Sequence, residues 1–221
     1  SKLKKVLNFL LEKNDITHQE LFNPFNYICC NQLLRQLEKL DSNCSKEQLF
    51  KSFMRNQLLI IALKKLLICN IKLEKVLTGI RSEMSDRIAN TKESINQHEL
   101  EFIIAIAEQC FLYEYVYSLT KEENISINTI IARCVNGEVN EINISIIACY
   151  LPLHKLLTQL PYLKSFNSSK QSFNELISLQ ILEPLEENKL SPKIKKIGLI
   201  NNDISKKVKS QYEENPYPRW R

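Results

Sequence analysis

Apolar residues recur along the chain at spacings of three and four, which is the pattern of amphipathic helices. The first such stripe lies near the amino terminus and comprises Leu3, Leu7, Leu10 and Leu11. Alternation of apolar and polar residues, the pattern of half-buried strands, is absent over any useful length, and the isoleucine-rich pieces around Ile127 and Ile142 come nearest to it. The pattern therefore predicts an all-α fold.

Start signals place the first helices. Asn23 followed by Pro24 predicts a capped helix start with a proline in its first turn. Ser45 with Gln48 three residues later forms a capping box, and we expect the long helix that it opens to run to about Cys69.

The middle of the chain predicts the core. A helix expected from about residue 73 to about residue 88 contains Gly79, which marks either a weak point or a close contact with another helix. Asn96 and Glu99 predict the start of a helix that reaches about Leu119. Because this helix is apolar on most faces, we expect it to be the buried central helix.

Shorter pieces follow. Two helices are expected on either side of Asn136-Gly137, the second ending at Leu151, and Pro152 begins a short helix to about Leu160. Residues 164–172 are polar and serine-rich and resemble a linker. The last packed helix is expected to bury Phe173, Ile177, Ile181 and Leu182.

From Glu183 onward the pattern predicts an arm. Ser191-Pro192 restarts a turn of helix, and Asp203 caps a final helix that ends before Pro216. The predicted fold is therefore an irregular multi-helix bundle with a C-terminal helical and extended arm. Its parts are a helical body over residues 1–163, the linker-like stretch, and C-terminal helices with an aromatic, proline-rich end over residues 173–221.

Glycine is scarce, and this limits the chemistry. The chain has three glycines in 221 residues, whereas average usage would give about fifteen. A phosphate or cofactor loop needs several glycines between a strand and a helix, but Gly79, Gly137 and Gly198 are isolated. We therefore expect no P-loop, no dinucleotide fold and no glycine-rich loop of a Rossmann-like methyltransferase within these residues.

Charge and hydropathy argue against two classes of partner. The net charge of +5 is mild, and acidic residues interleave with the basic ones, so the sequence lacks the basic face of a nucleic-acid-binding protein. The longest apolar runs, residues 58–63 and 102–107, are far shorter than the roughly eighteen residues of a membrane-spanning helix. No signal peptide is visible, and we expect a cytoplasmic protein without a membrane partner.

The cysteines favour packing over chemistry. Their number is odd, no C-x-x-C pair exists, and the histidines are distant in sequence, so a zinc site is not supported. We interpret them as reduced, buried, small apolar residues of a reducing cytosol. They are Cys29, Cys30, Cys44, Cys69, Cys110, Cys134 and Cys149.

Candidate catalytic groups are few. Glu108 and Glu114 lie in the most apolar regions. The aromatic neighbours of Glu114 are compatible with a catalytic role, but we favour a structural ion pair, for example with Arg133, or a hydrogen bond to a tyrosine. An autonomous enzyme would need Glu114 within reach of one of the histidines, His18, His98 and His154. His154 stands among apolar neighbours, as a core-edge or capping histidine does. We assign no catalytic, cofactor-binding or metal-ligating residue.

The most unusual composition lies at the end of the chain, in a segment that we name the C-terminal motif. It places three large aromatics, including the only tryptophan, around two prolines. Asn215-Pro216 and Tyr217-Pro218 favour extended backbone, and aromatics with polar tips favour half-buried interfaces. We therefore expect the motif to dock on another surface, with Tyr212, Tyr217 and Trp220 as anchors. Its residues are Gln211, Tyr212, Glu213, Glu214, Asn215, Pro216, Tyr217, Pro218, Arg219 and Trp220.

The motif, QYEENPYPRW, is similar to a segment of bacterial proteins that combine tetratricopeptide repeats with a class I S-adenosylmethionine-dependent methyltransferase domain. In that family the segment stands just before the first strand of the methyltransferase. AEQCFLYEYVYSLTKEE at 107–123, ACYLPLHKL at 148–156 and LEPLEE at 182–187 resemble the helical middle region of the family, in the same order. Residues 1–97 are similar only in being helical.

The resemblance implies a non-catalytic helical accessory domain that presents substrate or docks on the catalytic domain. The partner would be a methyltransferase domain, in the same chain or in another protein, and S-adenosylmethionine would be held there and not by these residues. The chain stops at Arg221, where the family's catalytic domain would begin, and no tetratricopeptide repeat is evident. The alternative is a stand-alone helical protein-protein interaction module.

Overall fold

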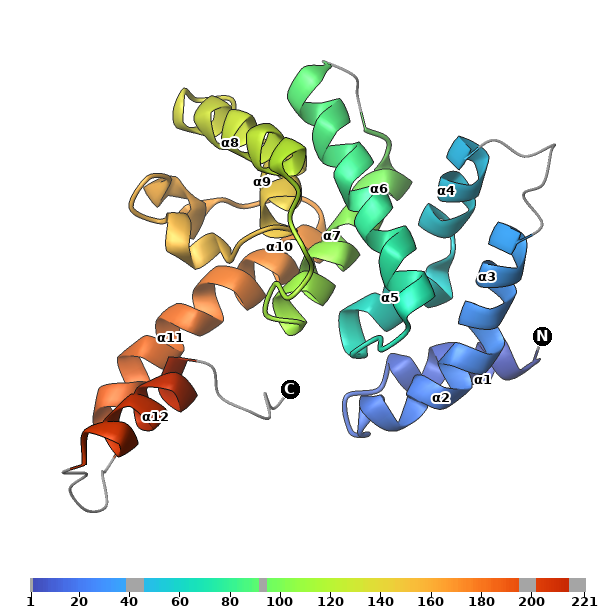
Figure 1. Cartoon of the computed structure of the whole chain (residues 1–221), viewed down its shortest axis with the longest axis horizontal. Coiled ribbons are helices and arrows are strands. Elements are labelled where there is room, and N and C mark those ends of the chain that lie inside the picture. Colours follow the sequence, from blue (N-terminus) through green and yellow to red (C-terminus); the bar gives the residue numbers. More distant parts are fainter. Residues whose placement is uncertain (1, 39–45, 92–94, 195–201, 215–221) are drawn as a thin grey trace. The chain divides into compact units, whose positions relative to one another are not determined.

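Helices account for all the regular secondary structure that the computed structural model describes, which covers residues 2–38, 46–91, 95–194 and 202–214 (Figure 1). The predicted all-α, multi-helix fold is confirmed. The chain divides into two units, Ser1–Leu185 and Glu186–Arg221.

The described residues of the first half of the chain form six α-helices. Short 3-10 and π turns at His18–Leu21 and Asn26–Cys30 make residues 18–38 one continuous helical run. The α-helices are α1 (Lys2–Leu11), α2 (Phe22–Phe25), α3 (Asn31–Glu38), α4 (Lys46–Met54), α5 (Gln57–Lys65) and α6 (Ile71–Asn90).

Six more α-helices follow among the described residues from 95 onward. They are α7 (Gln97–Leu112), α8 (Lys121–Val135), α9 (Glu141–Ala148), α10 (Gln171–Ile177), α11 (Glu183–Leu190) and α12 (Asp203–Glu214). Between them lie a π turn and three 3-10 turns, at Ser178–Leu182, Leu153–Leu156, Pro161–Ser165 and Ser191–Lys193.

Helix α7 is the central helix of the first unit, as the sequence predicts. It packs against α5, α9 and α10 (Figure 1), and every residue from Phe102 to Phe111 is buried. The expected end at Leu119 is wrong, because the helix stops at Leu112. Glu114 and Tyr115 follow with φ of +52° and +58°, a left-handed backbone that an α-helix cannot contain.

Two other expected helices also differ from the structure. The expected long helix to Cys69 is two helices, because Asn56 adopts an extended backbone and its side chain accepts a hydrogen bond from Leu59 N at 3.1 Å, which starts α5. The expected start at Asn23 is wrong because the chain is already helical from His18. Ser45 of the predicted capping box lies outside the described residues.

The two described glycines differ in role. A Cβ atom added to Gly79 would lie 3.8 Å from Phe50 Cζ, an ordinary van der Waals distance, so this glycine is a weak point of α6 and not a close helix contact. Gly137 has φ of +97° and separates α8 from α9 at the predicted place. Helix α9 ends at Ala148, three residues before the expected Leu151, and a 3-10 turn replaces the short helix expected at Pro152.

The part after the linker-like stretch is packed into the first unit. Phe173 and Leu176 of α10 are fully buried, and the unit extends to Leu185, beyond residues 164–172. In the second unit the side chain of Asn202 caps α12 by accepting hydrogen bonds from the backbone N–H groups of Ile204 and Ser205, so Asn202 and not Asp203 is the capping residue.

Within the described ranges, no helix has the length and apolar character needed to cross a membrane.

Candidate functional site

The beginning of the C-terminal motif is the last turn of α12. Gln211 and Tyr212 are exposed there, and the backbone remains helical to Glu214. The rest of the motif, residues 215–220 with Tyr217 and Trp220, lies outside the described residues.

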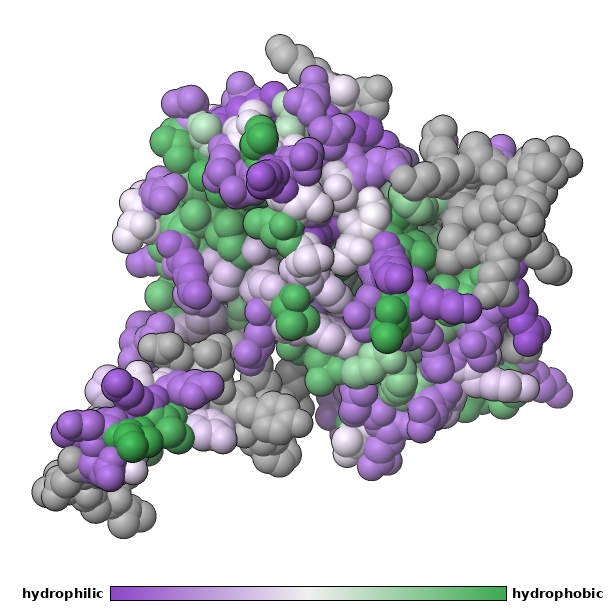
Figure 2. All heavy atoms as spheres, in the orientation of Figure 1, coloured by the Kyte–Doolittle hydropathy of each residue, from purple (hydrophilic) through white to green (hydrophobic). Residues whose placement is uncertain are grey.

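Helix α12 presents an exposed line of apolar side chains that we name the apolar row. Ile204, Val208 and Tyr212 follow one another at intervals of four, so they lie on one face of the helix. Their exposed fractions are 74%, 44% and 61%. Figure 2 shows apolar surface on α12 between hydrophilic patches. Predicted anchor Tyr212 is thus joined by two aliphatic residues that the sequence reasoning did not single out.

A second candidate site lies inside the first unit, around a buried arginine of α6, and we name it the Arg81 cluster. Arg81 is 4% exposed, and its Nη2 donates to Glu123 Oε1 of α8 at 3.1 Å and to Ser118 O at 3.0 Å. Tyr117 and Tyr150 place their rings 5.9 and 4.3 Å from its guanidinium carbon. The cluster comprises Arg81, Tyr117, Glu123, Tyr150 and Ser85.

Glu123 serves two purposes at once. Its Oε2 accepts from the backbone N–H of Thr120, and the Thr120 hydroxyl accepts from Glu123 N, which closes a capping box at the start of α8. Its Oε1 takes the Arg81 guanidinium and a 2.8 Å hydrogen bond from Tyr150 Oη. Tyr150 Oη also lies 3.0 Å from Ser85 Oγ. Both carboxylate oxygens of Glu123 are therefore used in contacts that hold the fold together.

The same arrangement occurs at the start of α7. Glu99 forms the predicted capping box with Asn96, through Oε2, and its Oε1 pairs with Arg87 Nη2 at 3.0 Å. Helix α6 therefore holds the starts of the next two helices with two arginines. The Arg87 side chain is 27% exposed, whereas that of Arg81 is 4% exposed.

Gln180 is a fully buried residue with four hydrogen bonds, and we call it the hub. Its Nε2 donates to the carbonyls of Ala107 and Ala148, and its Oε1 accepts from Tyr115 Oη and from Leu153 N, at 3.1 to 3.3 Å. The segments at 107–123 and 148–156, which carry the resemblance, thus contact each other here and at Glu123–Tyr150. Because all its capacity for hydrogen bonds is used, the hub positions backbone and has no group left for a reaction.

Two of the candidate catalytic residues, Glu108 and His154, are in structural contacts. Glu108 pairs with Lys64 at 3.4 Å. Arg133, the partner that the sequence suggested for Glu114, donates to the carbonyls of Ile88 and Ala89 at the end of α6. Glu114 is exposed in the left-handed segment. His154 Nδ1 lies 3.2 Å from Gln180 O, at the edge of the core as expected. His98 is exposed in the first turn of α7, and His18 lies in the turn before α2.

Burial keeps most of the cysteine thiols in the protonated, unreactive form. Burial raises the pKa of Cys29, Cys110 and Cys134 to about 11 and that of Cys30 to about 12, and it raises the pKa of Cys149 as well. A thiol is a nucleophile or metal ligand only as the thiolate, which these shifts suppress. Cys69 is exposed, and Cys44 lies outside the described residues. No group of three or more histidine, cysteine or acidic side chains in the described ranges could hold a metal ion.

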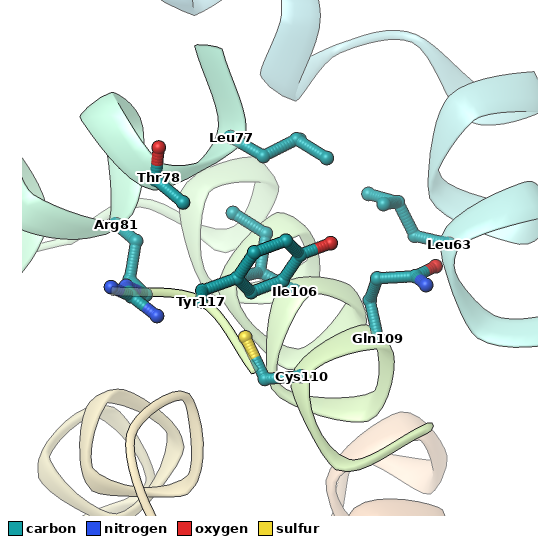
Figure 3. A pocket seen from close by; sticks show the side chains of 8 residues that line it. All are labelled: Leu63, Leu77, Thr78, Arg81, Ile106, Gln109, Cys110 and Tyr117. Carbon is teal, nitrogen blue, oxygen red and sulfur yellow. The ribbon is translucent and has the colours of Figure 1, made fainter. Parts of the chain in front are cut away.

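A small cavity borders the Arg81 cluster, between α6, α7 and the segment that follows α7 (Figure 3). It has a volume of about 10 Å³, which is room for one water-sized guest and far too little for a nucleoside. The residues that line it include Leu63, Leu77, Arg81, Gln109, Cys110 and Tyr117.

Sequence reasoning missed the Arg81 cluster, although one signal was present. Arg81 stands at an apolar position of the α6 stripe, four residues after Leu77 and three before Met84, both of which are buried. A charged residue in such a position predicts a buried ion pair. Its partners, Glu123 and Tyr150, come from distant segments, and sequence alone does not name them.

Comparisons of the chain with protein-family models, with curated proteins and with solved structures give no significant match.

Proposed function

We propose that the chain is a non-catalytic helical accessory module that acts through protein contacts, with the apolar row of α12 and the C-terminal motif as its docking element. The resemblance of the motif and of residues 107–123, 148–156 and 182–187 to methyltransferase-associated proteins supports a methyltransferase domain as the partner. S-adenosylmethionine would then be bound by that domain.

The chemistry of the first unit supports a binding role over catalysis. The Arg81 cluster and Gln180 use their polar groups for packing, and Glu108 is paired with Lys64. The cavity beside the cluster is too small for a cofactor. Titration of S-adenosylmethionine into the chain, followed by calorimetry, should therefore give no saturable heat.

The apolar row carries the proposal. Three large side chains at intervals of four on one helix face are the anchors that a partner groove reads when it binds an amphipathic helix. Tyrosine is enriched among the residues that dominate the energy of such interfaces. The adjoining motif adds Tyr217 and Trp220 to the same end of the chain.

Two experiments test the proposal. The coding sequence beyond residue 221 should encode a strand followed by a glycine-rich turn, and its absence would remove the methyltransferase partner and favour a stand-alone interaction module. If the domain is present, it can be produced separately and titrated with the chain. Ile204→Asp together with Val208→Asp should weaken binding about tenfold or more.

Ile125→Asp is the matched control, because Ile125 is 67% exposed on α8, away from the row in sequence. It should leave the affinity unchanged. Equal affinity of the row variant and the control would show that α12 is not the docking element.

A further inference from the structure

Helix α1 carries apolar side chains on two opposite sides. On the inner side Leu7 and Leu11 are 3% and 0% exposed, and they belong to the core of the first unit, where α1 packs against α5. On the outer side lie Leu3, Val6 and Phe9, with exposed fractions of 64%, 54% and 57%. Because these three residues follow one another at intervals of three, they form one line along the helix, which we name the α1 ridge.

Lysines surround the α1 ridge. Lys2 precedes it, Lys5 stands one helical turn before Phe9, and the Nζ atom of Lys13 lies 4.7 Å from the centroid of the Phe9 ring. All three lysines are exposed. The first fourteen residues of the chain contain four lysines and a single acidic residue, Glu12. The outer side of α1 therefore combines an apolar line with positive charge.

We propose that the α1 ridge docks on an anionic membrane surface, with α1 lying in the plane of that surface. Leu3, Val6 and Phe9 would enter the boundary between the headgroups and the acyl chains, as the apolar side chains of interfacial helices do. The long stems of the lysines let their ammonium groups stay among the lipid phosphates. Anionic lipids attract such juxtamembrane lysines.

Charge and shape select this occupant over three others. A second copy of the chain would bring lysines against lysines, which repel one another. A nucleic acid would pair the lysines with phosphates but would leave three large apolar side chains in water. A partner protein would need a groove of matching shape with acidic edges, whereas a fluid bilayer surface closes around a ridge that projects from a helix.

A contact of this kind needs no membrane-spanning helix. The short apolar runs that argue against a transmembrane segment therefore do not argue against it. The expectation of a protein without a membrane partner would then apply only to spanning segments. This inference is independent of the proposed function, which concerns α12.

Co-sedimentation of the full chain with lipid vesicles gives the first test. One set of vesicles is pure phosphatidylcholine, and the other contains about 30% phosphatidylserine, both at about 0.1 M salt. The chain should bind the anionic vesicles at least about tenfold more tightly, and the affinity should fall as salt screens the lysines. No binding to anionic vesicles, or equal binding to both sets, would overturn the inference.

Charge reversal locates the contact on α1. Lys2→Glu together with Lys5→Glu should weaken binding to the anionic vesicles by about tenfold or more. Lys155→Glu together with Lys164→Glu is the matched control, because it changes the net charge equally at two exposed lysines that are distant from α1 in sequence. The control should bind as the wild type does. Equal affinities of the two double variants would contradict the proposal.

Fluorescence tests the apolar part of the contact. Phe9→Trp in a Trp220→Phe background gives the chain a single indole on the α1 ridge, and it keeps a large aromatic side chain there, so the fold is not at risk. Anionic vesicles whose acyl chains are brominated should quench this indole. Ile125→Trp in the same background is the matched control, since Ile125 is 67% exposed on α8, and it should stay unquenched. No quenching on the ridge, or equal quenching in both variants, would show that α1 does not enter the membrane surface.

Discussion

Replacing Glu123 by glutamine tests whether the Arg81 cluster is a buried ion pair on which stability depends. The substitution keeps the size of the side chain and its capacity to close a capping box, because glutamine also serves at that position. It removes the negative charge and replaces one of two acceptor oxygens by an NH2 group, so the one remaining oxygen can serve either Arg81 or the Thr120 N–H. The Arg81 guanidinium then remains 4% exposed with a backbone carbonyl and a neutral amide as its partners.

The expected loss is large because solvent cannot replace the missing charge. Removing one member of a buried ion pair costs about 3–5 kcal/mol of the free energy of unfolding. With a urea dependence of about 2 kcal/mol per molar, this loss lowers the unfolding midpoint by about 2 M.

Glu99→Gln is the matched control. Glu99 has the same role in its own capping box and pairs with Arg87 of the same helix, but the Arg87 side chain is 27% exposed. Water can therefore solvate Arg87 after the substitution, and we expect a loss of about 1 kcal/mol.

Urea unfolding followed by far-UV circular dichroism measures both variants. Arg81→Met and Glu123→Leu can also be made separately and together. The double variant should lose less stability than the two single variants lose in sum, because no uncompensated charge stays buried in it. A Glu123→Gln midpoint equal to that of Glu99→Gln would refute the reasoning.

Three further predictions concern stability. Gly79→Ala should raise the free energy of unfolding by about 0.5–1 kcal/mol, because the added Cβ meets Phe50 at an ordinary van der Waals distance. Gly137→Ala should lower the free energy of unfolding by about 1 kcal/mol, because φ at this position is +97°. Thermal unfolding should show the two midpoints moving in opposite directions. Phe102→Ala removes a fully buried ring of the central helix and should cost about 3–5 kcal/mol in the same assay, and a cost below about 1 kcal/mol would contradict the assigned core. The pKa of Cys30 is raised by burial from 9.0 to about 12 in the folded chain, so its contribution to stability is complete below about pH 9 and is lost as the pH rises toward 12. Unfolding midpoints measured across this window should fall, and Cys30→Ala should lessen the slope by up to about 1.4 kcal/mol per pH unit.

Local patterns were sufficient to predict much of the fold. Asn96 with Glu99 predicted the capping box of α7, and the all-round apolar sequence predicted its central place. Gly137 predicted the separation of α8 from α9. These features depend on residues close together in sequence, so a single chain reveals them.

The features that the sequence did not predict depend on contacts between residues that are distant in sequence. The break at Asn56 carries no proline or glycine, and the turn after α7 places Glu114 and Tyr115 in the left-handed region without glycine. Such conformations are held by contacts such as the hydrogen bond from Tyr115 Oη to Ala148 O. The pairing of Arg81 with Glu123 likewise spans 42 positions of sequence. The apolar row remained hidden because Ile204 and Val208 sit among lysines that look like an ordinary polar helix.

The shared use of each capping glutamate has a consequence for hydrogen exchange. First-turn amides normally exchange with solvent deuterons early, because helix ends open without unfolding the rest. Here the carboxylates that close the starts of α7 and α8 are also the ones that bind α6, so opening either start means separating two helices. The backbone amides of Glu99 and Glu123 should therefore exchange as slowly as those in the middle of their helices.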